Sequence, residues 1–229
     1  MSRMENQFEY EKSLKKVSSY PFIRKYLPFD RLVIRPPAAL IVKAVFKTKI
    51  TPNQLTATSF FFALLAALAF SLGRYPFFVL AGCLSLTSTI FDAADGMLAR
   101  GKGMTSRYGA YLDLFLDRLA DFAVMAGATY GYARFSGHPR FMLFGLLTIA
   151  LYFLQLTLYY INNLYTRSEK SGEGAEAKSL AVFWIFVASV AGRPNFFLAG
   201  IFVMTIPSLI TKIIRFLAKG KAPAEAPAA

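Results

Sequence analysis

The chain has 229 residues, of which 55% are hydrophobic, and its formal net charge is +13. This balance is typical of an integral membrane protein and argues against a soluble domain, and the basic residues gather in short stretches between apolar runs, which argues against nucleic-acid binding. Cys83 is the one cysteine and His138 the one histidine, which excludes an intramolecular disulfide and a histidine-based zinc site.

Residues 1–50 predict an N-terminal segment that lies at the membrane surface on the cytoplasmic side. Aromatic residues are mixed with lysine and arginine over residues 1–30, as in segments that lie in the lipid interface. Pro36 and Pro37 then open an apolar run, residues 38–49, which is too short to cross the membrane and carries Lys43 and Lys47 on one face. We interpret this run as a juxtamembrane amphipathic helix.

Six longer apolar runs follow, and each predicts a transmembrane helix, because about 20 apolar residues cross the hydrocarbon core. The runs cover residues 55–72, 76–98, 108–132, 141–164, 180–191 and 196–217. The fifth is short, because Gly192-Arg193-Pro194-Asn195 interrupts it. The sequence therefore predicts an all-α polytopic membrane protein with one six-helix domain, residues 51–218, and a disordered alanine- and proline-rich tail, residues 219–229.

The distribution of basic residues predicts the orientation of these helices. Six spans put both termini on one side of the membrane, and the loops expected on that side carry most of the lysine and arginine. By the positive-inside rule, both termini face the cytoplasm.

Acidic residues interrupt the second and third apolar runs. A charged side chain at the centre of a bilayer costs about 2.5–3.5 kcal/mol on insertion scales, so such residues usually serve a function. Helical spacing puts two sets of residues on two helix faces, and a short connection lets the faces meet at the cytoplasmic ends of these helices. The sets are Asp92, Asp95, Gly96 and Ala99 on the second helix, and Gly109, Asp113 and Asp117 on the third.

These residue types point to metal-dependent phosphate chemistry. Carboxylate oxygens suit Mg²⁺, Mn²⁺ or Ca²⁺, and four carboxylates can bridge two ions roughly 3.5–4 Å apart. Gly96, Ala99 and Gly109 leave room for a ligand or allow close helix packing, and the planar fork of Arg100 suits phosphate oxygens. A cation transporter is an alternative, but it predicts a path open to both sides and often an internal repeat, which this sequence does not show.

The pattern resembles a known signature at every fixed position. Asp92-x-x-Asp95-Gly96-x-x-Ala99-Arg100, eight further residues, and Gly109-x-x-x-Asp113-x-x-x-Asp117 resemble the motif of the CDP-alcohol phosphotransferases. The preceding Thr51-Pro52-Asn53-Gln54-Leu55-Thr56 resembles the loop before the first span of this family. The resemblance covers residues 51–121, and the C-terminal half contributes no motif.

The resemblance implies an enzyme that moves a phosphoryl-alcohol group, such as phosphatidyl, from a CDP-alcohol donor to the hydroxyl of an acceptor alcohol and releases CMP in phospholipid biosynthesis. It implies two Mg²⁺ or Mn²⁺ ions held by Asp92, Asp95 and Asp113, with Asp117 as the general base and a further metal contact. The implied donor contacts are Gly96, Ala99, Arg100, Ser106, Gly109, Asn53 and Thr56. A homodimer is also expected from the family.

The signature does not separate the possible substrates. The donor is either CDP-diacylglycerol, with inositol phosphate, glycerol phosphate or serine as acceptor, or a CDP-linked soluble headgroup such as CDP-inositol. Other polar residues have simpler interpretations. Ser106 suits the N-cap of the third span, Arg118 and Asp121 suit an ion pair across one helical turn, and Tyr159 and Tyr160 suit an aromatic belt. Lys212 suits either an anionic acceptor or membrane anchoring.

Overall fold

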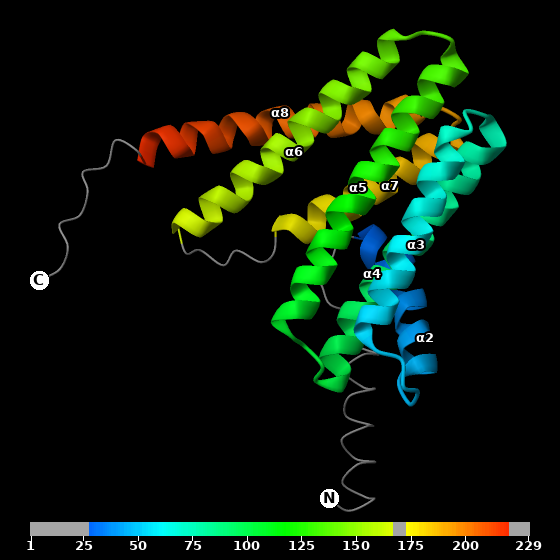
Figure 1. Cartoon of the computed structure of the whole chain (residues 1–229), viewed down its shortest axis with the longest axis vertical. Coiled ribbons are helices and arrows are strands. Elements are labelled where there is room, and N and C mark those ends of the chain that lie inside the picture. Colours follow the sequence, from blue (N-terminus) through cyan, green and yellow to red (C-terminus); the bar gives the residue numbers. More distant parts are fainter. Residues whose placement is uncertain (1–27, 167–172, 220–229) are drawn as a thin grey trace, which may run out of the picture.

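The computed structural model describes residues 28–166 and 173–219, and every regular element within them is helical (Figure 1). A π-helical turn, η2 (Asp30–Ile34), leads into α2 (Arg35–Val45). The long helices are α3 (Pro52–Ser71), α4 (Tyr75–Lys102), α5 (Arg107–Ser136), α6 (Arg140–Thr166), α7 (Glu173–Val190) and α8 (Pro194–Lys219). The predicted all-α fold is confirmed. The predictions for residues 1–27 and for the tail beyond residue 219 lie outside the described residues.

Each predicted span corresponds to one of the helices α3 to α8. Within the described residues, four helical segments are long and apolar enough to cross a membrane: Pro52–Ser71, Tyr75–Lys102, Arg140–Ile161 and Pro194–Ile214. The apolar part of α7, Ala181–Val190, is shorter, and α5 carries the acidic residues of the motif. Large apolar side chains cover the outer surface, with Leu68, Leu143 and Val203 each more than 60% exposed. Such a surface suits lipid, so the polytopic membrane fold is confirmed.

Local sequence signals set the ends of the helices near the motif. The Thr51 N–H donates to Gln54 Oε1 at 2.9 Å, and Pro52 occupies the first turn of α3, where no N–H partner is needed. Gly103 ends α4 in the left-handed conformation, with φ of 65°. Ser106 then caps α5 by accepting a hydrogen bond from the Gly109 N–H at 2.9 Å. The chain therefore reverses between α4 and α5 within four residues, 103–106.

Helix α2 confirms a short helix before the first span, at slightly different bounds from the predicted 38–49. It begins at Arg35 and has Pro36 and Pro37 in its first turn, where prolines are tolerated. The side chain of Arg35 pairs with that of Asp30, with Nε and Oδ2 3.1 Å apart. Its buried face packs against the start of α3 and the C-terminal half of α4, in a cluster made of Ala38, Ala39, Val42, Leu55, Ala94, Met97 and Leu98.

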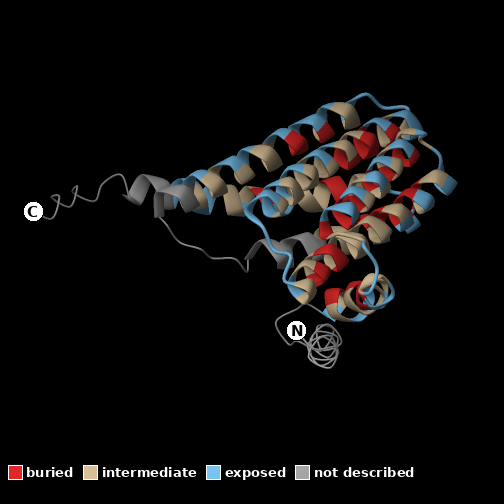
Figure 2. Ribbon diagram, turned by 60° about the horizontal axis from the view of Figure 1, so that its bottom comes forward, coloured by how far each residue is buried: buried red, intermediate tan, exposed pale blue. Residues whose placement is uncertain are grey.

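Helix α3 lies against both motif helices. It packs along α4 and along α5, whereas α4 and α5 have little backbone contact with each other. Gly127 and Gly131 allow the close approach of α5, because a side-chain carbon at either position would clash with the carbonyl oxygen of Ala67 or Phe70. Helices α6, α7 and α8 spread to one side of this group (Figure 1), and buried residues follow the inward faces of the helices (Figure 2).

Candidate functional site

Three of the four motif aspartates come together in the structure. One carboxylate oxygen from each of Asp92, Asp95 and Asp113 lies within 4.8 Å of the other two. Asp95 is buried, and Asp92 and Asp113 are half-buried. Asp117 is one turn further along α5 and is not part of this group. The meeting of the two carboxylate faces, which the spacing predicts, therefore holds for the first three residues.

Thr56 contacts this group from α3. Its hydroxyl lies 2.7 Å from Asp95 Oδ2 and 3.2 Å from the Pro52 carbonyl oxygen. Both Thr56 and Asp95 are 6% exposed. The hydroxyl therefore restrains the carboxylate of Asp95 by a buried hydrogen bond to a charged acceptor.

Three residues named for donor contact converge beside this group. A side-chain carbon at Gly109 would lie 3.1 Å from Ser106 Oγ and 3.2 Å from Asn53 Oδ1. The capping interpretation of Ser106 is confirmed by its hydrogen bond to Gly109, and its contact with a nucleotide stays a prediction. The absence of a side chain at Gly109 thus lets the start of α3 and the start of α5 approach each other.

Arg100 folds back along α4 over Gly96. Two of its guanidinium nitrogens would lie 3.3 Å from a side-chain carbon at Gly96. Gly96 therefore leaves the room that the guanidinium takes. Ala99 lies one turn beyond Asp95 and is half-buried.

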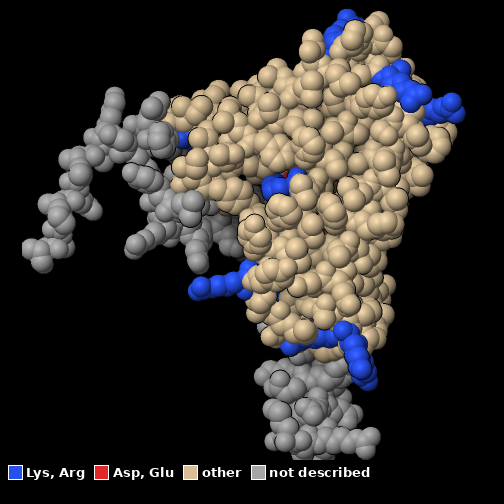
Figure 3. Space-filling view, viewed as in Figure 1, with Lys and Arg blue, Asp and Glu red and all other residues tan. Residues whose placement is uncertain are grey.

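A cavity of about 730 Å³ opens from the aspartates into the helix bundle. All six long helices contribute to its wall, and the polar and charged side chains that line it are Thr56, Ser59, Ser85, Ser88, Thr89, Asp92, Asp113, Asp117, Arg118, Asp121, Tyr152, Gln155, Tyr159, Tyr160, Ser208 and Lys212. Figure 3 shows a hollow near the middle of one face with basic atoms inside it. The volume and the mixed lining suit a small-molecule site.

The lining of this cavity includes two tyrosines that the sequence alone did not connect with it. Tyr159 and Tyr160, which suit an aromatic belt, line the cavity wall. The Lys212 ammonium lies 5.2 Å from the centre of the Tyr159 ring, so α8 brings a cation to the same wall. The apolar periodicity of α6 and α8 does not reveal that these three residues line a cavity, because both helices also face lipid.

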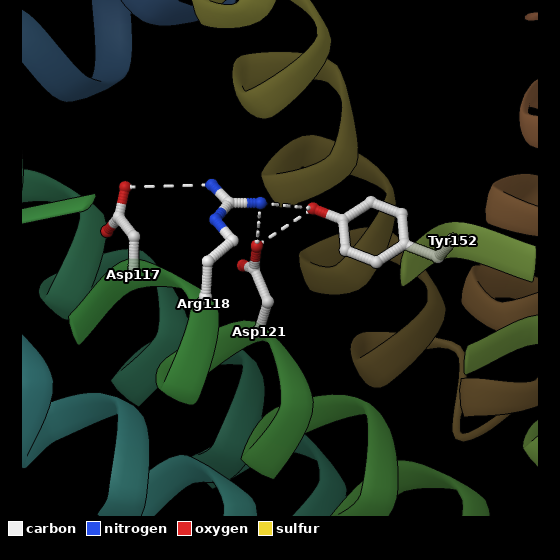
Figure 4. Close-up of polar contacts among 4 residues, drawn as sticks. All are labelled: Asp117, Arg118, Asp121 and Tyr152. Carbon is white, nitrogen blue, oxygen red and sulfur yellow. Dashed lines mark hydrogen bonds and ion pairs between the residues drawn. The ribbon is translucent and has the colours of Figure 1, made fainter. Parts of the chain in front are cut away.

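A network beside Asp117 joins α5 to α6 (Figure 4). The predicted pair of Arg118 and Asp121 is confirmed, with Nη1 and Oδ2 separated by 2.9 Å. Tyr152 completes the network: its hydroxyl donates to Asp121 Oδ2 at 2.8 Å and accepts from Arg118 Nη1 at 3.1 Å. Arg118 Nη2 lies 3.9 Å from Asp117 Oδ2. Sequence reasoning missed Tyr152, because no motif marks it.

The acidic group fits a hard divalent cation. Its three ligand atoms are all carboxylate oxygens, which Mg²⁺ and Mn²⁺ prefer, and they are close enough to share an ion. Among the described residues, no cysteine or histidine belongs to the group, so the ligands do not favour zinc.

A comparison of the sequence with models of known protein families identifies the family of this chain. The model described as CDP-alcohol phosphatidyltransferase matches residues 49–215. The chain belongs to this family. It is an integral membrane transferase that moves a phosphoryl-alcohol group from a CDP-alcohol donor to an acceptor alcohol in phospholipid synthesis. The expectation of an enzyme is confirmed, and the cation transporter is set aside.

Two relatives with named activities match most of the chain, and a third matches a shorter part of it. An "Archaetidylinositol phosphate synthase" of Pyrococcus horikoshii is 32% identical over 188 residues, which are 80% of this chain and 90% of that protein. A "Phosphatidylinositol phosphate synthase" of Streptomyces avermitilis is 30% identical over 216 residues, 88% of this chain and 83% of that protein. A "Bifunctional IPC transferase and DIPP synthase" of Thermococcus kodakarensis is 39% identical over 89 residues, 39% of this chain and 20% of that protein.

Proposed function

We propose that this CDP-alcohol phosphotransferase transfers a lipid phosphoryl group from a CDP-linked lipid to a hydroxyl of a phosphorylated polyol such as inositol phosphate. The two relatives that match most of the chain are named as synthases of inositol phosphate lipids. The observation that carries the proposal is the cavity itself, which is lined by the motif carboxylates of Asp92, Asp113 and Asp117 and also by Lys212. A phosphorylated acceptor needs such a cation, because a buried phosphate without one is strongly destabilised.

Each side chain then has a defined role in the proposal. Asp92, Asp95 and Asp113 hold Mg²⁺ or Mn²⁺ in a two-ion site, and Arg100 binds the donor diphosphate beside Gly96. The metal ions would supply positive charge that stabilises the CMP leaving group. Lys212 binds the phosphate of the acceptor. Asn53, Thr56, Ala99, Ser106 and Gly109 shape the donor side of the site.

Asp117 completes the site as the general base. The acceptor oxygen forms a bond to the phosphorus that carries the lipid, the bond from this phosphorus to CMP breaks, and the carboxylate of Asp117 accepts the hydroxyl proton. A carboxylate with an ordinary pKa near 4 is a weak base toward an alcohol. The base must therefore lie close to the acceptor, and the position of Asp117 in the lining of the same cavity as Lys212 supports this role.

The proposal includes an orientation and an assembly. The excess of lysine and arginine in alternate loops supports an active site and termini that face the cytoplasm, and family membership supports a homodimer. A division into an interfacial segment, residues 1–50, a catalytic domain, residues 51–218, and a tail completes the scheme.

A second candidate uses a CDP-linked polyol, such as CDP-inositol, as the donor. The similarity to the Thermococcus kodakarensis protein supports it, although the match covers a fifth of that protein. The two candidates differ in which substrate carries the nucleotide, so they predict different products from the same mixture of acceptors.

The test is a substrate matrix. The purified protein in lipid nanodiscs is incubated with each CDP-alcohol and each acceptor, CMP release is measured, and the product is identified by mass. We expect CMP release only when a CDP-linked lipid and a phosphorylated polyol are both present. Release with CDP-inositol as the donor in place of a CDP-linked lipid would favour the second candidate, and no release with any pair would contradict both.

A further inference from the structure

Arg118 lies between two carboxylates of α5 and binds them unequally. Its Nη1 atom is 2.9 Å from Asp121 Oδ2, whereas its Nη2 atom is 3.9 Å from Asp117 Oδ2 (Figure 4). The first distance is that of a close ion pair, and the second is too long for a direct hydrogen bond. The guanidinium is therefore bound to Asp121 and only close to Asp117.

Tyr152, which lies on α6, strengthens the contact between Arg118 and Asp121. Its hydroxyl donates to Asp121 Oδ2 at 2.8 Å and accepts from Arg118 Nη1 at 3.1 Å, and these two hydrogen bonds close a triangle with the ion pair of Arg118 and Asp121. Each bond polarises the next in a half-buried setting. The triangle fixes one end of the guanidinium through α6, which has no residue in the family signature.

We propose that Asp121 and Tyr152 are positioning residues that hold Arg118 back from Asp117. All four side chains line the same cavity. A direct hydrogen-bonded pair between Arg118 and Asp117 would engage the carboxylate oxygens that must accept the proton of the acceptor. The inference rests on the proposed role of Asp117 as the general base, and it adds a reason for the polar residues around that base.

The arrangement predicts what happens when the triangle is broken. Without the carboxylate of Asp121, the guanidinium loses its closer ion-pair partner, and its other ion-pair contact is Asp117. A half-buried cation that loses its partner moves to the nearest available carboxylate, because an uncompensated charge is costly there. Arg118 would then bind Asp117 directly, and removal of Arg118 as well would release the base.

The experiment uses the full-length enzyme in nanodiscs and four variants: Asp121→Asn, Tyr152→Phe, Arg118→Met, and the double variant of Asp121→Asn with Arg118→Met. We expect kcat for CMP release to fall about 100-fold in Asp121→Asn and about tenfold in Tyr152→Phe, with the KM of the donor changed less than about twofold. The double variant should recover about tenfold over Asp121→Asn alone.

Tyr130→Phe is the matched control, because Tyr130 also lies on a motif helix, is 48% exposed, and is not among the residues that line the cavity. It should keep the wild-type kcat. A purely structural role would reduce the folded fraction of each variant, measured by CDP binding, and a second substitution would not reverse the loss.

The inference is overturned if the double variant is no more active than Asp121→Asn, or if Tyr152→Phe behaves as Tyr130→Phe. If Asp121→Asn fails to bind CDP, Tyr152→Phe decides alone, since it removes one hydroxyl and keeps the ring. Wild-type enzyme that releases no CMP from any donor contradicts the proposed function instead, so the two failures are distinguishable.

Discussion

The hydroxyl of Thr56 provides a sharp test of the proposed metal site. Thr56→Val removes this one polar group and keeps the β-branched shape, so the packing of α3 is retained. The hydroxyl lies 2.7 Å from Asp95 Oδ2, and both residues are 6% exposed. The substitution therefore withdraws one hydrogen bond from a proposed metal ligand without touching the other two.

The size of the effect follows from this buried contact. A hydrogen bond to a charged group contributes about 1.5–3 kcal/mol, and loss of a partner that orients a metal ligand typically lowers metal affinity about 10- to 100-fold. We expect the Mg²⁺ or Mn²⁺ concentration for half-maximal CMP release to rise by that factor. At saturating metal, kcat should stay within about threefold of wild type, because the carboxylates themselves remain.

The assay is a metal titration of enzyme that has first been stripped with chelator. Thr58→Val is the matched control: the hydroxyl of Thr58 donates to the Gln54 carbonyl oxygen of its own helix, at 2.8 Å, in an exposed hydrogen bond. Equal half-maximal metal concentrations for Thr56→Val and Thr58→Val would refute the reasoning that Thr56 supports a metal ligand.

Further predictions concern the base, the metal and the helix packing. Asp117→Asn should lower CMP release about 100-fold or more while CDP binding, measured by calorimetry, persists, because a general base is lost and the other three metal ligands, Asp92, Asp95 and Asp113, remain. EDTA should abolish CMP release, and added Mg²⁺ or Mn²⁺ should restore it. Gly131→Ala should cost about 1–3 kcal/mol in thermal unfolding, because its new side chain meets the Phe70 carbonyl oxygen, whereas Gly200→Ala, with open space around it, should cost nothing.

Each of these predictions has a result that contradicts it. Undiminished turnover by Asp117→Asn would remove this residue from the role of base. Full activity in chelator would rule out the metal site. Equal unfolding temperatures for Gly131→Ala and Gly200→Ala would mean that α5 does not approach α3 as closely as the structure has it.

The motif on α4 and α5 was predictable because helical spacing is a local property. Asp92 and Asp95 are three residues apart and share a face of α4 whatever the rest of the fold does. Their meeting with Asp113 required only the short turn of residues 103–106, which local capping residues define. Asp117 follows the same periodicity, but one further turn carries it away from the group of three.

The contacts between distant segments were not predictable in the same way. Tyr152 meets Asp121 across 31 positions, and its surroundings in the sequence are an ordinary apolar span. The packing of α3 between the motif helices was also missed, although Gly127-x-x-x-Gly131 is a signal for close approach of helices. Periodicity says which residues share a face but not which helix that face meets.

The packing of α2 has a consequence for the smallest unit that can carry this chemistry. Ala38 and Val42 pack in the cluster that contains Ala94 and Met97, on the same helix as Asp92 and Asp95. A chain shortened to begin at Thr51 would keep every residue of the signature. It would lose the residues of α2 that pack against α4, the helix that carries Asp92 and Asp95. Since a helix that loses its packing opens first, such a fragment should fail through mobility of α4 rather than through any missing catalytic group.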